Sequence, residues 1–146
     1  MAKLALGDLD VDGKRVLVRV DFNVPMDEQQ TISDDRRIRS SLPTVRRIIE
    51  EGGTPILISH LGRPKGRPDP RYGLRPVADR LTQYIDTPIK FATDCVGEEA
   101  RMIVDTLKVG EVLLLENLRF HAGETQNDPE FSKQLASYAE IGRAHV

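Results

Sequence analysis

The chain has 146 residues, with 21 Lys and Arg against 23 Asp and Glu, so its formal net charge is −2. This balance argues against a dedicated nucleic-acid binder, which carries a strong basic excess, and no apolar run approaches the roughly 18 residues that a membrane span needs. The single cysteine excludes a disulfide framework and a cysteine zinc cluster. With no signal-peptide pattern at its N-terminus, the chain is expected to form about one globular domain in a reduced, cytoplasmic setting.

The first part of the chain alternates between strand and helix patterns. Residues 14–20 form a β-branched run that predicts a strand. Apolar residues at helical spacing over 42–49 predict a helix, with Pro43 in its first turn and a glycine pair after its end. Residues 55–59 are a short apolar run, which is typical of a buried strand.

The same alternation continues along the rest of the chain. The patterns predict, in order, a loop over 63–73, a helix over 76–85, a short strand over 89–91, a helix over 98–108, a buried strand over 112–115 and a helix over 129–138. Strands separated by helices imply right-handed crossovers and parallel pairing. The sequence therefore predicts an α/β fold, a doubly wound, Rossmann-like parallel sheet with helices on both faces.

Basic residues gather in the middle of the chain, between Arg36 and Arg75, while acidic residues lie mostly before and after this stretch. A basic segment inside a nearly neutral chain fits a local anion site. It also fits a solvated, arginine-rich surface. Charge alone leaves both interpretations open.

Polar residues follow the predicted strands at the edge where open α/β sheets bind their ligands. Asp21 and Asn23 follow the first strand, His60 and Arg63 follow the second, and Arg119 follows the last. Guanidinium groups suit phosphate and carboxylate oxygens, Asp21 and Asn23 can accept hydroxyl hydrogen bonds, and His60 can donate to an oxyanion. The set predicts a site for a small phosphorylated hydroxy acid; separate strand-end ion pairs and turns are the alternative.

Common motifs for other chemistries are absent from the sequence. There is no Gly-x-x-x-x-Gly-Lys-Ser/Thr loop, no Gly-x-Gly-x-x-Gly after the first strand, no His-Glu-x-x-His and no Gly-x-Ser-x-Gly. His121 and His145 are isolated in the sequence and favour surface or structural roles, and Cys95 is expected to fill space in the core. We therefore predict no metal ligands and no nucleotide cradle.

Several ordered segments of the chain are similar to the phosphoglycerate kinase family. They are Lys14–Pro25, Arg37–Ile38 with Ser41–Thr44, Ser59–Gly66 and Leu114–Phe120. The resemblance runs from about Leu4 to about Ala139. It implies the amino-terminal, substrate-binding domain of a two-domain glycolytic enzyme.

The resemblance implies a set of side chains that contact the substrate: Asp21, Asn23, Arg37, His60, Arg63 and Arg119. Asp21 and Asn23 match contacts to the hydroxyl and carboxyl region of 3-phosphoglycerate. Arg37 matches the catalytic arginine at the transferring phosphate, although Arg36 is adjacent and the choice rests on the residue that follows. His60 and the other two arginines match further substrate contacts, the arginines chiefly to its phosphate.

The chemistry implied by the resemblance is phosphoryl transfer between 1,3-bisphosphoglycerate and ADP, giving 3-phosphoglycerate and ATP. Such transfer depends on positioning and charge neutralisation more than on a covalent nucleophile. The family holds ATP or ADP with Mg²⁺ on a second, C-terminal domain, which we expect to be absent here, and closes around a hinge. The expected whole enzyme is a monomer without nucleic-acid or membrane partners.

The end of the chain departs from the resemblance. The match stops near Glu140, so we expect residues 1–140 to be a partial domain and residues 141–146 to be a non-native tail. The family's next strand would then be missing, leaving the neighbouring strand unpaired and the apolar face of the 129–138 helix partly exposed. The chain alone is expected to be inactive; a non-catalytic anion-binding fragment is the alternative function.

Overall fold

The computed structural model describes residues 10–64, 66–121 and 128–145. Its centre is one five-stranded sheet with the order β3-β4-β2-β1-β5, in which every pairing is parallel. The strands are β1 (Arg15–Arg19), β2 (Thr54–Ile58), β3 (Ile89–Ala92), β4 (Val112–Leu115) and β5 (Ile141–His145). The predicted α/β class and parallel sheet are confirmed.

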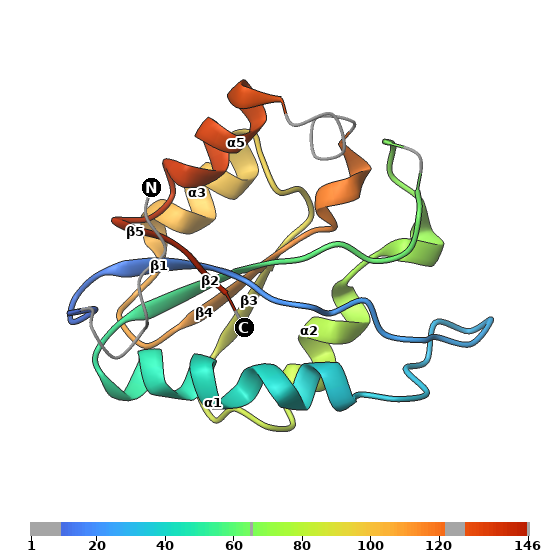
Figure 1. Cartoon of the computed structure of the whole chain (residues 1–146), viewed down its shortest axis with the longest axis horizontal. Helices are drawn as coiled ribbons and strands as arrows, with labels where there is room; N and C mark the ends of the chain where they lie inside the picture. The colour runs from blue at the N-terminus through green and yellow to red at the C-terminus, as the bar shows by residue number, and fades with distance from the viewer. Residues whose placement is uncertain (1–9, 65, 122–127, 146) are drawn as a thin grey trace.

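Helices cover both faces of the sheet. One face packs against α1 (Arg36–Glu50) and α2 (Arg75–Leu81), and the other against α3 (Glu98–Thr106) and α5 (Pro129–Ala136), as Figure 1 shows. Two short 3₁₀ turns, η2 (Pro70–Tyr72) and η3 (Leu118–Phe120), lie in the loops. In the part of the chain that the structure describes, every helix is too short or too polar to cross a bilayer.

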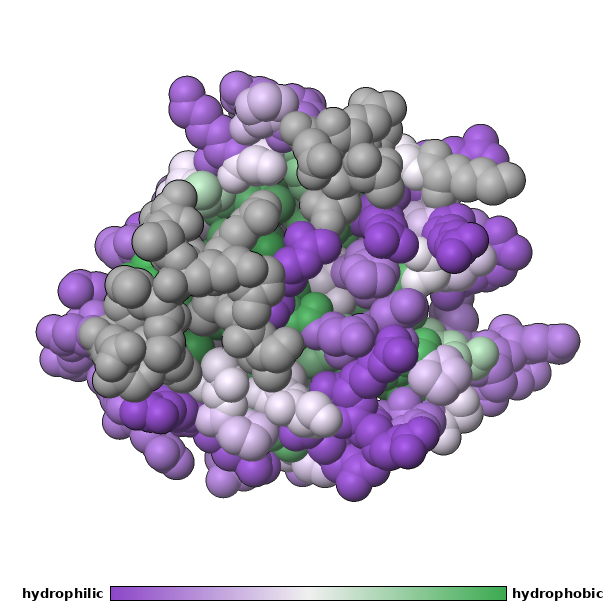
Figure 2. Space-filling model, in the orientation of Figure 1, coloured by the Kyte–Doolittle hydropathy of each residue, from purple (hydrophilic) through white to green (hydrophobic). Residues whose placement is uncertain are grey.

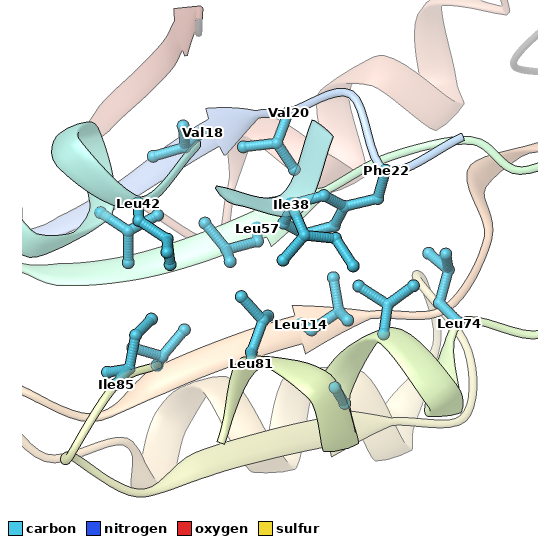
Figure 3. Packing of buried hydrophobic residues seen from close by; sticks show 14 of the residues in the cluster. Val18, Val20, Phe22, Ile38, Leu42, Leu57, Leu74, Leu81, Ile85 and Leu114 are labelled. Atoms are coloured by element: carbon cyan, nitrogen blue, oxygen red, sulfur yellow. The ribbon is translucent and has the colours of Figure 1, made fainter. Parts of the chain in front are cut away.

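The core consists of two apolar layers separated by the sheet. Leu57 and Leu114 belong to the layer beneath α1 and α2, where Figure 3 shows them among side chains such as Ile38. Leu113 and Leu115 belong to the opposite layer beneath α3 and α5. Successive side chains of a strand point to opposite faces, so a continuous apolar run in β4 supplies both layers at once.

Helix α1 begins earlier than the sequence pattern predicted. Pro43 lies inside the helix, so its placement in the first turn was wrong. The earlier start is favoured because Ile38, which is fully buried, extends the apolar stripe by a turn. The helix tolerates Pro43, whose ring removes one backbone donor, and Ser41 donates its hydroxyl to the Ile38 carbonyl at 2.6 Å nearby.

The predicted open edge beside β1 is wrong for this structure. β5 lies alongside β1, with Val16 opposite Ile141 and Arg19 opposite His145, and the register shifts between Val16 and Val18. Ladder hydrogen bonds are made by backbone groups, so an extended segment of different sequence can satisfy them. The expected exposure of the last helix is wrong too, since Phe131, Leu135 and Tyr138 are buried.

Candidate functional site

The loops that follow β1 and β2 are joined at the carboxyl edge of the sheet. The buried Ser59 hydroxyl accepts the Phe22 N–H at 3.0 Å and donates to the His60 carbonyl at 3.0 Å. Further out, Asn23 Oδ1 accepts the Gly62 N–H at 3.0 Å. The predicted convergence of the Asp21–Asn23 and His60–Arg63 segments is therefore confirmed by direct contacts between the two loops.

A fully buried amide, Asn117, ties the loop after β4 to the same edge. Its Nδ2 donates to the Leu61 carbonyl at 2.7 Å and to the Tyr72 carbonyl at 3.0 Å. Its Oδ1 accepts the Leu61 N–H at 3.2 Å and the Arg119 N–H at 2.9 Å. Sequence reasoning missed this clamp; the available signal was a polar residue two positions after an apolar strand.

Glu116, which is half-buried, provides a second support behind the clamp. Its Oε1 accepts the Leu74 N–H and the Asn117 N–H, both at 2.8 Å. Burial raises the pKa of this carboxyl above its ordinary value, and the two backbone N–H groups act in the opposite direction. Since Leu74 directly precedes α2, Glu116 connects the start of that helix to the carboxyl edge.

Adjacent arginines at the start of α1 point to different partners. Arg37 Nη1 donates to the Asn23 carbonyl at 2.6 Å and lies 3.5 Å from Asp21 Oδ1. The Arg36 guanidinium pairs with Asp34, with Nη2 and Oδ2 2.9 Å apart, and this carboxylate raises the pKa of Arg36. Of the two, Arg37 is therefore the one bonded to the loop that carries Asn23.

An open hollow of about 640 Å³ lies between the loop after β1 and the start of α1. Its lining is Asn23, Val24, Pro25, Asp34, Arg36, Arg37 and Ser40. A second hollow of about 430 Å³ adjoins it through Asn23 and Val24 and extends to Gly62 and Tyr72. Figure 2 shows mainly hydrophilic side chains where these loops lie, on the right of the view. Both volumes fall within the range of small-molecule sites.

Arg119, which lies in η3 after β4, contacts the loop that follows β2. Its Nη1 lies 3.4 Å from the Gly62 carbonyl, and its buried Nε has no hydrogen-bond partner among the residues that the structure describes. A buried donor without an acceptor is costly, and most native structures avoid it. An anion bound beside Gly62 would supply that acceptor. The exposed Arg63 and the half-buried His60 lie on this loop.

These contacts place all six predicted side chains on the loops and helix end of one sheet edge. Asp21, Asn23 and Arg37 contact one another directly, and Arg119 contacts the loop of His60 and Arg63 through Gly62. The fold and the site together define a class: an open α/β domain whose arginine-lined hollow lies at the carboxyl edge of a parallel sheet.

Comparisons with known proteins assign the family. The phosphoglycerate kinase family model matches residues 6–142, so the chain belongs to the phosphoglycerate kinase family. It is 57% identical over 141 residues to the phosphoglycerate kinase of Aquifex aeolicus, and 54% identical over the same length to that of Chlorobium limicola. These alignments cover 97% of this chain but only 35% and 36% of the two relatives.

Solved structures agree with this assignment. The phosphoglycerate kinase of Coxiella burnetii superposes with a TM-score of 0.81 at 32% identity, covering 99% of this chain and 35% of that one. The enzyme of Pyrococcus horikoshii gives a TM-score of 0.84 at 30% identity, covering 99% and 36%. The chain thus spans about a third of the length of the relatives that it matches.

Proposed function

We propose that this chain is the substrate-binding part of a phosphoglycerate kinase and that its arginine-lined edge binds 3-phosphoglycerate. The single observation that carries the proposal is Arg119, whose buried Nε has no acceptor among the described residues and whose Nη1 reaches the Gly62 carbonyl. The chain belongs to the phosphoglycerate kinase family. A phosphate oxygen of the substrate would be a suitable acceptor for this guanidinium.

The other side chains are assigned to the phosphate, carboxylate and hydroxyl groups of the substrate. We assign Arg63, on the same loop as Gly62, to the phosphate together with Arg119, and His60 to a further substrate contact. Asn23 Oδ1 already accepts the Gly62 N–H, so its amide N–H groups are the ones available to the substrate carboxylate. Asp21 would accept a hydrogen bond from the substrate hydroxyl.

Arg37 would act on the phosphoryl group that is transferred. In this structure its Nη1 donates to the Asn23 carbonyl and lies beside Asp21, so its Nη2 and Nε groups can donate to a phosphate oxygen. A guanidinium there neutralises charge as the phosphoryl group moves between 1,3-bisphosphoglycerate and ADP. Arg36, held by Asp34, would contribute only to the local positive potential.

Nucleotide and metal are assigned to the part of the relatives that this chain does not cover. Two carboxylates, Asp21 and Asp34, lie beside the first hollow, and each has a guanidinium next to it, an arrangement that does not fit Mg²⁺. We therefore derive no step through the metal at this edge. The proposed whole enzyme is a cytoplasmic monomer that uses ATP or ADP with Mg²⁺, and the 146-residue chain alone would bind substrate without turning it over.

Calorimetric titration of the chain with 3-phosphoglycerate tests the proposal. Arg119→Ala and Arg63→Ala should each remove a charged hydrogen-bond set and cost roughly 1.5–3 kcal/mol of binding free energy. The matched control is Arg46→Ala: this arginine lies on the exposed face of α1 and donates to the Tyr84 carbonyl at 2.7 Å. Equal losses in all three variants would show diffuse charge attraction and overturn a shaped site. A coupled assay with ATP should detect no turnover by the chain alone.

A further inference from the structure

The other half of the same sheet edge gathers three side chains of a different kind. We propose that Asp94, Cys95 and His121 form a binding site for a divalent transition metal ion of the zinc class. Asp94 and Cys95 follow β3, and His121 follows η3 just after β4. Because β3 and β4 pair in parallel up to Ala92 and Leu115, the segments that follow them leave the sheet side by side.

The geometry of the three donors is close to that of a coordination sphere. One ligand atom from each residue lies within 4.8 Å of the other two, and His121 Nε2 is 2.6 Å from Asp94 Oδ1. Zinc bonds of roughly 2.0–2.3 Å in a tetrahedral arrangement separate ligand atoms by roughly 3.3–3.8 Å. Small rotations of the Asp94 and His121 side chains would therefore suffice. The sequence pattern gave His121 no partner, and the structure places it against Asp94, 27 positions away.

The chemistry of the donors selects the metal. Thiolate sulfur and imidazole nitrogen suit zinc and its neighbours in the first transition row, whereas Mg²⁺ and Ca²⁺ take oxygen ligands. As the sulfur–metal bond forms, the Cys95 thiol gives its proton to solvent. The neutral His121 ring offers the Nε2 lone pair with its proton on Nδ1, and Asp94 offers a carboxylate oxygen. Two negative ligands balance the divalent ion, and water takes the fourth position.

Neighbouring groups hold the three donors in place. The Tyr138 hydroxyl donates to the Cys95 carbonyl at 3.2 Å, and Asp94 Oδ1 accepts the Cys95 N–H at 2.7 Å. The His121 ring packs against Phe131 of α5, with ring centroids 5.4 Å apart. Such supporting contacts orient metal ligands and tune their basicity. They also link the site to α5, so a bound ion would stabilise the packing of that helix.

The three donors differ in their exposure to solvent. Cys95 is fully buried in the layer beneath α3 and α5, while the side chains of His121 and Asp94 are 33% and 48% exposed. An ion arriving from solvent would meet the carboxylate and imidazole first and the sulfur last. The arginines of the anion site are Arg37 at the start of α1, Arg63 on the loop after β2 and Arg119 in η3, so the two ligand chemistries occupy neighbouring but different parts of the edge.

Titration of the chelator-treated full chain with Co²⁺, followed by displacement with Zn²⁺, tests the proposal. We expect one thiolate-to-cobalt charge-transfer band at one equivalent, and its loss when zinc is added. Cys95→Ser should abolish the band, and His121→Gln or Asp94→Asn should weaken zinc binding by at least roughly tenfold, the lower end of what loss of a supporting group costs. Glu99→Gln and His60→Gln are matched controls outside the triad and should bind zinc like the original chain.

Each outcome of this titration decides the proposal. Absence of a charge-transfer band in the original chain overturns it, as does zinc affinity that His121→Gln and Asp94→Asn leave unchanged. Equal weakening in the two control variants would also overturn it, because it would show non-specific metal binding. Circular dichroism of each variant checks the fold. If Cys95→Ser fails to fold, the two partly exposed positions still decide the question.

Discussion

The two halves of the sheet's carboxyl edge share one topology and differ in chemistry. On the β1–β2 half, Arg37 at the start of α1 and Arg63 after β2 are exposed, and the loops beside them are held by the buried Ser59 and Asn117. On the β3–β4 half, Cys95 belongs to the core beneath α3 and α5, and the partly exposed Asp94 and His121 lie next to it. The difference in cover accompanies a difference in side-chain chemistry: the β1–β2 half presents guanidinium groups that suit an anion, while the β3–β4 half presents a carboxylate, a thiol and an imidazole that suit a metal ion.

Removing the amide clamp should have the largest effect and should fall on the β1–β2 half. Asn117→Ala would leave the Leu61 N–H, the Leu61 carbonyl and the Tyr72 carbonyl without their partner. At 1–3 kcal/mol for each buried group left unpaired, the free energy of unfolding should fall by about 3 kcal/mol. Urea denaturation measures this loss.

Asn23→Ala provides the matched comparison for the clamp. Asn23 is half-buried and its side chain accepts one N–H, that of Gly62. Its removal should cost about 1 kcal/mol. If both variants lose the same stability, burial of the Asn117 amide does not distinguish the two positions and the clamp has no special role.

A smaller effect is expected on the β3–β4 half. Tyr138→Phe keeps the buried ring and removes only the hydroxyl that donates to the Cys95 carbonyl. The free energy of unfolding should fall by about 1 kcal/mol, and zinc affinity should fall with it. Affinity for 3-phosphoglycerate should stay unchanged in the same protein. A loss of 3-phosphoglycerate affinity would show that the two halves are not independent.

Acid should weaken the connection between α1 and α2 through Asp35, which precedes α1 and pairs with Arg39 and Arg80. The Tyr84 hydroxyl, then Arg80 and Arg39, lower the pKa of Asp35 from 3.8 to about 2. Because the folded-state pKa is depressed, this stabilisation is present above pH 3.8 and is lost as the pH falls from 3.8 towards about 2. Thermal unfolding across this range should show the loss, and Tyr84→Phe should shift it to higher pH. A profile unchanged by Tyr84→Phe would contradict the assignment.

The smallest effect separates two neighbouring arginines. Arg37→Ala removes the donor to the Asn23 carbonyl and should lower 3-phosphoglycerate affinity. Arg36→Ala breaks only an exposed pair with Asp34, and such pairs contribute little, so affinity should be unchanged within error. Calorimetry on the two variants side by side makes the comparison, and a greater loss in Arg36→Ala would reverse the assignment.

Much of the fold and half of the site follow from local sequence signals. Alternating strand and helix patterns predict the parallel sheet, and the rule that ligands bind beyond strand ends brings Asp21, His60 and Arg119 to one edge. The Asn117 clamp could not be predicted, because it joins residues 56 positions apart that no spacing connects. The same holds for His121 and Asp94, which are 27 positions apart.

Other differences have physical causes that a pattern search does not weigh. The start of α1 was placed at Pro43 because proline is favoured in a first turn, yet burial of Ile38 extends the helix past that preference. The pairing of β5 with β1 was missed because the expected family motif is absent from Ile141–His145. Backbone hydrogen bonding needs no such motif. That residues 141–146 are a non-native tail stays a prediction.

A two-ligand titration followed by amide nuclear magnetic resonance tests the division of the edge most directly. Adding 3-phosphoglycerate to the chain should shift the amides of Asn23, Gly62 and Arg119. Adding Zn²⁺ to a separate, chelator-treated sample should shift those of Asp94, Cys95 and His121. Two distinct sets of shifted amides are the result that this account predicts. Shifts by 3-phosphoglycerate that centre on Asp94 and His121, or that spread evenly over the surface arginines, would contradict it.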